Sequence, residues 1–118
     1  MQIQLLYFDG CPSHTTAHER LHRVLAELGL DLPVQVIAVE TDAAAQQWQF
    51  PGSPTIRING HDIDPLPAAT PYALACRAYR HPDGRITPLP SADLIRTALQ
   101  HARAVPTTAA DPETPPID

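Results

Sequence analysis

Two short apolar runs with a helical stretch between them constrain the fold of this chain most. Residues 3–8 (IQLLYF) and residues 34–39 (VQVIAV) have the composition of buried strands. Between them, residues 12–28 carry apolar side chains at spacings of three and four, the period of an amphipathic helix: Ala17, Leu21, Val24, Leu25 and Leu28. Two strands joined through a helix are usually parallel, with a right-handed crossover. The chain is therefore expected to begin with a β-α-β unit.

A tight turn predicts the second half of the sheet. Residues 42–50 (DAAAQQWQF) suit a second, short helix. TIRI, residues 55–58, alternates in the manner of a strand. Asn59-Gly60 is a typical two-residue hairpin turn, so the chain is expected to return antiparallel through residues 61–63.

A last helix completes the predicted fold. Ser91 can cap this helix, and five residues are expected to form its inward face: Leu94, Ile95, Ala98, Leu99 and Ala102. The element order is therefore β-α-β-α-β-β-α, which predicts an α/β fold with a four-stranded mixed sheet and helices on both faces. Residues 70–90 form an insertion before the last helix.

The charge and length of the chain exclude several classes of function. Its 118 residues suffice for one domain, expected over residues 1–104, and the Pro-, Thr- and acid-rich residues 105–118 are expected to be a disordered tail. A net charge of −5 without a basic run argues against nucleic acid as a partner. No apolar segment is long enough to cross a membrane, so no membrane partner is expected. Two cysteines are too few for a disulfide-stapled secreted scaffold, which favours a reducing, cytoplasmic setting.

Cys11 stands where the first helix is predicted to begin, and Pro12 follows it directly. The first amides of a helix lack internal partners and carry partial positive charge, which stabilises a thiolate and lowers its pKa. Pro12 suits the first helical position, where its missing N–H costs nothing. His14, one turn inward, can donate a hydrogen bond or positive charge to the sulfur. These features favour a reactive thiol, and the alternative is a buried, inert Cys11.

Three histidines follow one another at four-residue spacing: His14, His18 and His22. On a helix this spacing stacks side chains along one edge, and neighbouring pairs can chelate a metal ion. No carboxylate completes a recognisable metal-binding signature with them. We therefore expect no metal site and no cofactor, and interpret His14 as a neighbour of the Cys11 thiol.

Two further motifs, by their order and spacing, resemble those of the thioredoxin fold. A Cys-Pro pair (residues 11–12) stands at a helix start, and Ser53-Pro54-Thr55 enters the predicted hairpin. The segment GSPTIRINGHDID is similar to the stretch in thioredoxins and glutaredoxins where a cis-proline faces the active cysteine. The resemblance covers residues 3–63 and the last helix, and it implies a thioredoxin-like arrangement of the sheet.

The resemblance also implies roles for individual residues. Cys11 corresponds to the nucleophilic cysteine, Pro54 corresponds to the cis-proline, and four residues are implied to bind the substrate: Pro12, Ser53, Pro54 and Thr55. His14 occupies the place of the resolving cysteine, so a mixed disulfide on Cys11 has no second thiol one turn away. The protein is therefore expected to be a poor dithiol reductase of the thioredoxin kind.

The second cysteine, Cys76, lies in the insertion. In glutaredoxin-like relatives the chain that leaves the hairpin passes beside the nucleophile. The resemblance therefore allows residues 64–76 to cover the Cys11 site, with Cys76 releasing a mixed disulfide. The alternative is that Cys76 is a core residue of the insertion, because free cysteines are often buried.

A later Cys-Arg-x-Tyr segment (residues 76–79) gives a second resemblance, to small bacterial proteins described as alkylmercury-lyase-like. Organomercurial lyases use a cysteine pair and an aspartate to cleave a carbon–mercury bond. The corresponding residues here would be Cys11, Cys76 and either Asp9 or Asp62. Thiolates are soft ligands, which suits a soft metal. The alternative is that both aspartates are ordinary turn and edge-strand residues.

Three classes of function follow from these patterns. The first is a thiol-dependent redox protein, a thiol–disulfide oxidoreductase whose partner is glutathione or a protein thiol or disulfide. The second is a protein that handles soft metals or organomercury compounds through a thiol pair. The third is a noncatalytic thioredoxin-like module that binds a partner. We favour the first hypothesis, and the fold alone does not decide among the three.

Overall fold

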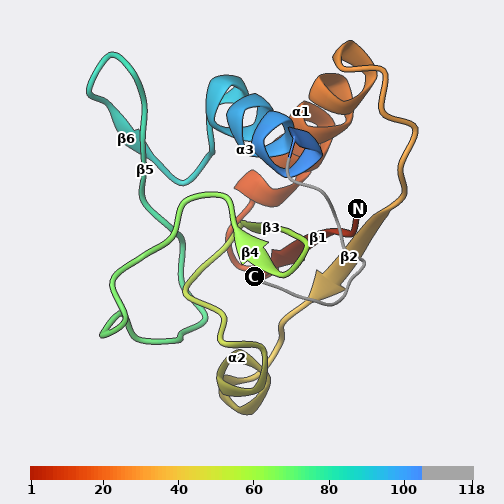
Figure 1. Ribbon diagram of the computed structural model, residues 1–118. Helices are drawn as coiled ribbons and strands as arrows, with labels where there is room; N and C mark the ends of the chain where they lie inside the picture. The colour runs from red at the N-terminus through yellow and green to blue at the C-terminus, as the bar shows by residue number, and fades with distance from the viewer. Residues whose placement is uncertain (105–118) are drawn as a thin grey trace.

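The start of the chain forms the predicted β-α-β unit. The structure, a computed structural model, describes residues 1–104 (Figure 1); the disordered tail predicted for residues 105–118 lies outside them. Strand β1 (Ile3–Tyr7), helix α1 (Ser13–Glu27) and strand β2 (Val34–Ala38) follow in order. Strands β1 and β2 pair in parallel along their whole length, which confirms the expected connection.

Side-chain caps fix the starts of the other two helices. Helix α2 (Asp42–Trp48) begins after Thr41, whose hydroxyl accepts a hydrogen bond of 3.0 Å from an amide of the first turn. Helix α3 (Ala92–Ala104) begins after Ser91, whose hydroxyl accepts a 3.0 Å hydrogen bond in the same way. Each cap satisfies one of the helix amides that have no partner within the helix.

The Asn-Gly turn produces the predicted hairpin of strands β3 (Thr55–Ile58) and β4 (His61–Asp62). Asn59 and Gly60 have φ angles of 54° and 82°, the left-handed conformation that a two-residue hairpin turn requires. Strand β3 also pairs antiparallel with β1. The resulting mixed sheet has the strand order β2-β1-β3-β4.

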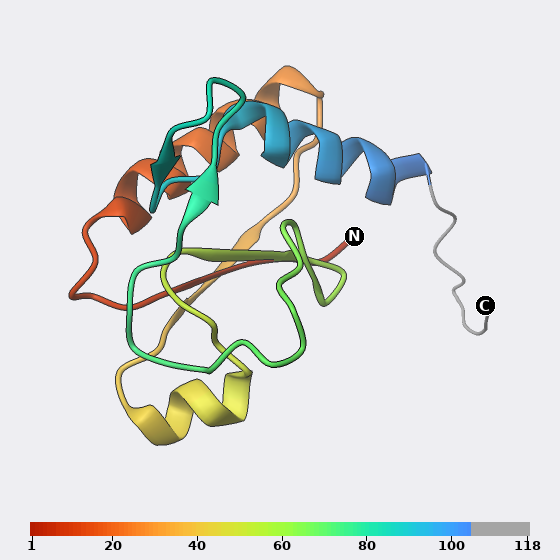
Figure 2. The same ribbon diagram turned by 90° about the vertical axis from the view of Figure 1, so that its left-hand side faces the viewer.

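Helices cover both faces of this sheet, as the sequence predicts. Helices α1 and α3 lie on one face and α2 lies on the other (Figure 2). The larger core cluster lies under α1 and α3 and contains Ile3, Leu5, Leu21, Val24, Leu25, Ile56, Ile58, Ile63, Ile95 and Leu99. The smaller one lies under α2 and contains Leu6, Val39, Ala45 and Phe50. Within residues 1–104, no helix is long and apolar enough to cross a membrane.

The prediction that residues 34–39 form a buried strand is wrong in one respect. Strand β2 lies at the edge of the sheet, and none of its five residues is fully buried. Val36 is 45% exposed, and only Val39, just beyond the strand, is completely buried. An apolar run predicts extended backbone, but its place within the sheet depends on which other strands pair with it.

The insertion forms a small hairpin of its own. Strands β5 (Tyr79–Arg80) and β6 (Ile86–Thr87) pair antiparallel and are separate from the main sheet. Gly84 turns the chain between them with a φ of 89°. This hairpin connects the main sheet to α3, and the segment just before it passes the start of α1.

We expect the contact between α3 and the sheet to be essential for stability. Replacing the fully buried Leu99 with alanine removes core contacts, and should lower the free energy of unfolding by about 2–5 kcal/mol. Gln100→Ala, at the exposed neighbouring position, should change it by less than about 0.5 kcal/mol. Urea unfolding of both variants, measured under the same redox conditions, gives the difference. Equal effects would show that α3 does not pack as described.

Candidate functional site

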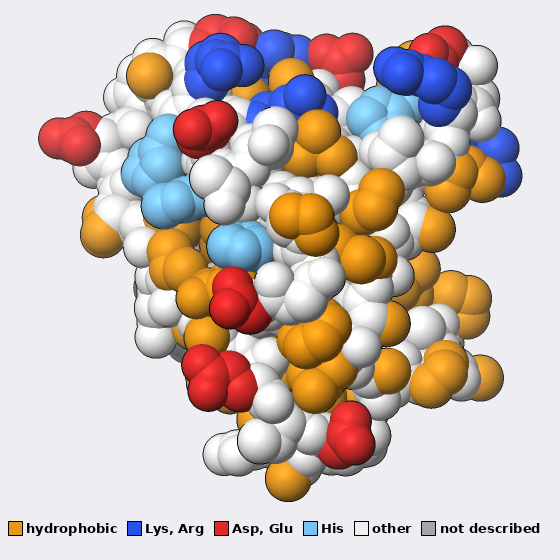
Figure 3. Space-filling view, turned by 180° about the vertical axis from the view of Figure 1, so that it is seen from behind, with side chains coloured by type: hydrophobic (Ala, Val, Ile, Leu, Met, Phe, Trp, Pro, Cys, Tyr) orange, Lys and Arg blue, Asp and Glu red, His pale blue; other side chains and the backbone are white. Residues whose placement is uncertain are grey.

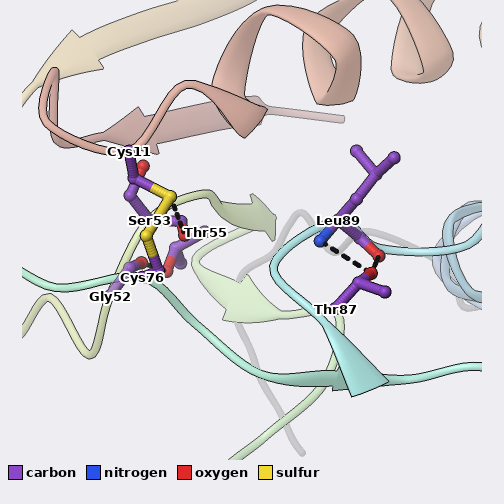
Figure 4. The surroundings of a disulfide bond; sticks show 7 residues. All are labelled: Cys11, Gly52, Ser53, Thr55, Cys76, Thr87 and Leu89. Atoms are coloured by element: carbon purple, nitrogen blue, oxygen red, sulfur yellow. Dashed lines mark hydrogen bonds between the residues drawn. A yellow bond between two sulfur atoms is a disulfide. The ribbon is translucent and has the colours of Figure 1, made fainter. Parts of the chain in front are cut away.

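The two cysteines of the chain lie side by side and form a disulfide (Figure 4). They are 65 residues apart in sequence, and their Cα atoms are 5.7 Å apart. Cys11 lies in the loop between β1 and α1, whereas Cys76 lies in the segment before β5. The predicted placement of Cys76 beside Cys11 is confirmed, and the catalytic roles of the two residues stay predictions.

Cys11 is buried at the start of α1. Its backbone amide donates a 3.0 Å hydrogen bond to the carbonyl oxygen of Phe8, which turns the chain from β1 toward the helix. Pro12, predicted at the first helical position, lies instead at the N-cap position directly before Ser13 and makes no side-chain capping hydrogen bond. Only 1% of Cys11 is exposed, and its Sγ lies 3.6 Å from the Ser53 carbonyl oxygen. The sulfur therefore lies at the positive end of a fifteen-residue helix and away from solvent.

The segment around Cys76 pairs with the backbone of Ser53. The Ser53 amide donates to the Ala75 carbonyl oxygen (2.7 Å), and the Arg77 amide donates to the Ser53 carbonyl oxygen (2.9 Å). Together these bonds form a short parallel bridge between Ser53 and Cys76. The bridge places the Cys76 sulfur opposite the start of α1.

The Ser53-Pro54-Thr55 segment begins at this bridge. The Ser53–Pro54 peptide bond is cis, as predicted. All three residues are buried, whereas Pro12 is exposed. The Thr55 hydroxyl donates a 2.6 Å hydrogen bond to the Gly52 carbonyl oxygen, so it stabilises the loop. The substrate-binding role that the resemblance implies for these residues stays a prediction.

Gly52 allows the bridge to form, and the sequence argument did not single it out. Its φ is 145°, a conformation that residues with a Cβ rarely adopt. A Cβ at this position would lie 2.8 Å from Arg77 Cγ and 3.2 Å from the Ala75 carbonyl oxygen. Only glycine therefore leaves room for the Cys76 segment. A glycine next to Ser-Pro at the end of a loop is the signal that points to such a close approach.

A buried ion pair anchors the chain directly after Cys76. The Arg77 guanidinium donates to Asp62 Oδ2 and to the Asp64 carbonyl oxygen, both at 2.7 Å. It also lies over the Tyr79 ring, 4.6 Å from the ring centroid. Breaking a buried pair of this kind leaves an uncompensated charge, so the arrangement resists local opening. The Asp62 carboxylate, one of the two candidate acids named above, is therefore held in an ion pair with Arg77.

Tyr79 provides a second anchor on the same side. Its hydroxyl donates a 2.6 Å hydrogen bond to the Pro54 carbonyl oxygen, and the residue is completely buried. Burial raises the pKa of the Tyr79 phenol, so the hydroxyl keeps its proton and remains a donor. This hydrogen bond was not predicted from the sequence. Cys76 is therefore held in place by contacts that do not involve its sulfur.

His14 lies near the start of α1 but contacts other residues than Cys11. Its ring stacks on Tyr7 with 4.3 Å between the ring centroids. Its Nε2 lies 3.7 Å from Asp9 Oδ1. No hydrogen bond joins His14 to the Cys11 sulfur among the residues that the structure describes. The expected hydrogen bond to the thiol is thus absent there, and the imidazole stacks on the Tyr7 ring instead.

The remaining histidines of α1 form a pair on the surface. The Nε2 atoms of His18 and His22 are 3.0 Å apart, and a group of histidines is visible on the face shown in Figure 3. Burial, together with the neighbouring His22, lowers the pKa of His18. Within residues 1–104, no group of three or more potential ligands is placed to hold a metal ion.

A cavity of about 280 Å³ lies beside the hairpin of β3 and β4. Its lining includes Arg57, Asp62 and Tyr72, and neither cysteine contributes to it. The disulfide therefore lies outside this cavity.

The chain was also compared with known proteins. No protein-family model, no curated protein and no solved structure matches it. The cysteine pair and its surroundings are therefore the features from which a function can be inferred.

Gly52→Ala is expected to weaken the disulfide specifically. The added Cβ must displace the Cys76 segment, and overpacking of this kind costs about 1–3 kcal/mol. The equilibrium constant for disulfide formation in a glutathione buffer should therefore fall by about tenfold or more. Mass spectrometry of alkylated samples measures the oxidised fraction.

Gly29→Ala is the matched control for this substitution. Gly29 also has a positive φ, of 70°, but nothing lies within 4 Å of its added Cβ. It therefore introduces backbone strain without touching the Cys76 segment, and its oxidised fraction should match that of the unmodified protein. An equal loss in both variants would mean that general destabilisation, rather than the close approach at Gly52, causes the effect.

Proposed function

We propose that this protein is a thiol–disulfide oxidoreductase with a thioredoxin-like fold, and that Cys11 and Cys76 form its redox centre. The observation that carries the proposal is the meeting of the only two cysteines at the start of a helix, across 65 residues of sequence. A dithiol that closes to a disulfide exchanges two electrons with an external thiol or disulfide. The proposed reaction needs no metal ion or cofactor.

Two features support the thioredoxin-like part of the proposal. The element order through the main sheet is β-α-β-α-β-β, followed after the insertion by a last helix. In the sheet, β1 pairs in parallel with β2 and antiparallel with β3, and β3 pairs antiparallel with β4. Cys11, the proposed reactive residue, follows the end of β1. The Ser53 carbonyl lies beside the Cys11 sulfur, where the resemblance puts the loop that faces the nucleophile.

The proposed compartment also favours a redox role over a purely structural one. We propose a cytoplasmic setting, in which glutathione and related systems keep most thiols reduced. Disulfides that form in such a setting are usually transient and catalytic or redox-sensing. Partial positive charge at the helix terminus beside Cys11 favours a thiolate there, which helps this sulfur to leave when the disulfide opens.

The surroundings of Ser53 favour small substrates. An extended polypeptide substrate would pair with the Ser53 backbone, but its amide and carbonyl already bond to Ala75 and Arg77. A polypeptide would have to displace this bridge, whereas glutathione needs only access to a sulfur. We therefore propose low-molecular-weight thiols and disulfides as the substrate class.

Soft-metal binding is a second candidate, which the meeting of two sulfurs at one site also supports. Reduced Cys11 and Cys76 could together hold a mercuric ion, because soft thiolates suit soft metals. Cleavage of a carbon–mercury bond needs an acid as well. Asp62 is paired with Arg77, and Asp9 is exposed beside His14. Mercury-binding stoichiometry of the reduced protein separates this candidate from the first.

Catalysis of thiol–disulfide exchange tests the proposal. The unmodified protein should accelerate the glutathione-dependent reduction of hydroxyethyl disulfide, and the Cys11→Ser, Cys76→Ser double variant should show only the uncatalysed rate. Gln100→Ala, at an exposed position of α3, is the control and should keep full activity. Equal rates for the unmodified protein and the double variant would favour the noncatalytic binding module.

A preference for small substrates is expected in the same assay. Displacing the two backbone hydrogen bonds of Ser53 costs about 1–3 kcal/mol for each group left without a partner. The value of kcat/KM for hydroxyethyl disulfide should therefore exceed that for insulin by about 10- to 100-fold or more. Comparable values for the two substrates would show that the bridge opens readily or that polypeptides bind elsewhere.

A further inference from the structure

The two sulfurs of the disulfide differ in their access to solvent. Cys11 is 1% exposed, which leaves no path for an external thiol to its sulfur. Cys76 is exposed, and so are Ala75 before it and Ala78 after it. The small side chains of both alanines leave the approach to Cys76 open. Of the two cysteines, Cys76 is therefore the residue that is open to an external thiol.

We propose that Cys76 is the sulfur that exchanges with the substrate and that Cys11 is the leaving and resolving group. This assignment rests on the proposed function and deepens it. It reverses the roles that the resemblance to thioredoxins implies, in which Cys11 attacks the substrate. Thiol–disulfide exchange depends on which sulfur the incoming thiolate can reach, and here that sulfur belongs to Cys76.

The position of Cys11 suits a leaving group. A sulfur leaves faster when its thiol has a lower pKa, and the start of α1 stabilises the Cys11 thiolate. When Cys11 later takes up a proton, the Ser53 carbonyl oxygen at 3.6 Å can accept a hydrogen bond from the thiol. Cys76 lies in an extended segment without a helix terminus, so its thiolate lacks this stabilisation. Access thus favours attack at Cys76, and the helix terminus favours Cys11 as the group that leaves.

The reaction balances with two external thiols as the reductant. A first thiol releases its proton to solvent, and its thiolate attacks Cys76 Sγ. A mixed disulfide forms on Cys76, the bond between Cys11 and Cys76 breaks, and the electron pair stays on the Cys11 thiolate. A second thiolate attacks the external sulfur of the mixed disulfide and releases Cys76 as a thiolate. Two thiols become one disulfide, and both cysteines take up protons from solvent.

The same steps in reverse describe reduction of an external disulfide. The Cys76 thiolate attacks the substrate and forms a mixed disulfide, and the substrate's other sulfur leaves as a thiolate. The Cys11 thiolate then attacks Cys76 Sγ, closes the internal disulfide and releases the second substrate thiolate. The bridge to Ser53 and the anchors at Arg77 and Tyr79 keep Cys76 next to Cys11 throughout.

Single serine variants test this assignment with oxidised glutathione as the probe. Cys11→Ser leaves only Cys76, and the folded variant should gain one glutathione quickly. Cys76→Ser leaves only the buried Cys11, which should react at least about tenfold more slowly. Intact-mass spectrometry over time gives both rates. Repeating the reaction in guanidinium chloride removes the difference in access, so the two rates there should become similar.

The unmodified protein provides a second measurement that needs no substitution. The oxidised protein is treated briefly with reduced glutathione, quenched with acid and then alkylated, so that any mixed disulfide is trapped. Cleavage after arginine separates Cys11, in residues 1–20, from Cys76, in residues 58–77. Glutathione should be found on the peptide of Cys76 and the alkyl group on that of Cys11.

The possible results separate this assignment from the proposed function. Glutathione on the Cys11 peptide, or a folded Cys76→Ser variant that reacts as fast as Cys11→Ser, would overturn the assignment while exchange activity stands. If no mixed disulfide accumulates because Cys11 resolves it too quickly, the rates of the two single variants decide. If the unmodified protein has no activity above the double variant, the proposed function itself fails.

Discussion

The backbone bridge between Ser53 and Cys76 is the interaction on which the site depends. It joins a loop of the main sheet to the insertion, and it lies directly beside the disulfide. Gly52 makes the close approach sterically possible, and the ion pair of Arg77 with Asp62 prevents the segment from moving away. The disulfide is thus a consequence of how the insertion docks. The insertion is therefore part of the proposed redox centre.

The sequence predicts the regular part of the fold because those signals are local. Three such signals each act within a few residues, and each is confirmed. They are the period of the apolar residues before Leu28, the cap at Ser91 and the Asn59-Gly60 turn. The exposure of β2 could not be predicted in this way. A strand's burial depends on its neighbours in the sheet, which lie far away in the sequence.

The site, like the fold, could be predicted from the sequence only in part. Cys11 and its helix start are visible in the sequence, and the resemblance to the thioredoxin fold led to the cis bond before Pro54 and to Cys76 as a neighbour. The anchoring of Cys76 was not predicted, because it depends on a charge pair between residues fifteen positions apart and on a hydrogen bond between Tyr79 and Pro54. The orientation of His14 was also missed, since helical spacing alone does not reveal the competing surface of Tyr7.

The position of the second sulfur links the redox state to the stability of the whole chain. A cysteine in place of His14 would close a loop of only a few residues with Cys11. In the loop-entropy description, such a disulfide lowers the entropy of the unfolded chain and stabilises the fold by about 2 kcal/mol. Cys76 instead closes a loop across a sequence separation of 65, for which the same description gives about 4 kcal/mol. Oxidation therefore fastens the insertion to the β-α-β unit. Reduction leaves that connection to Arg77, Tyr79 and the Ser53 bridge, so the strength of these contacts determines how well the reduced protein keeps its two thiols together.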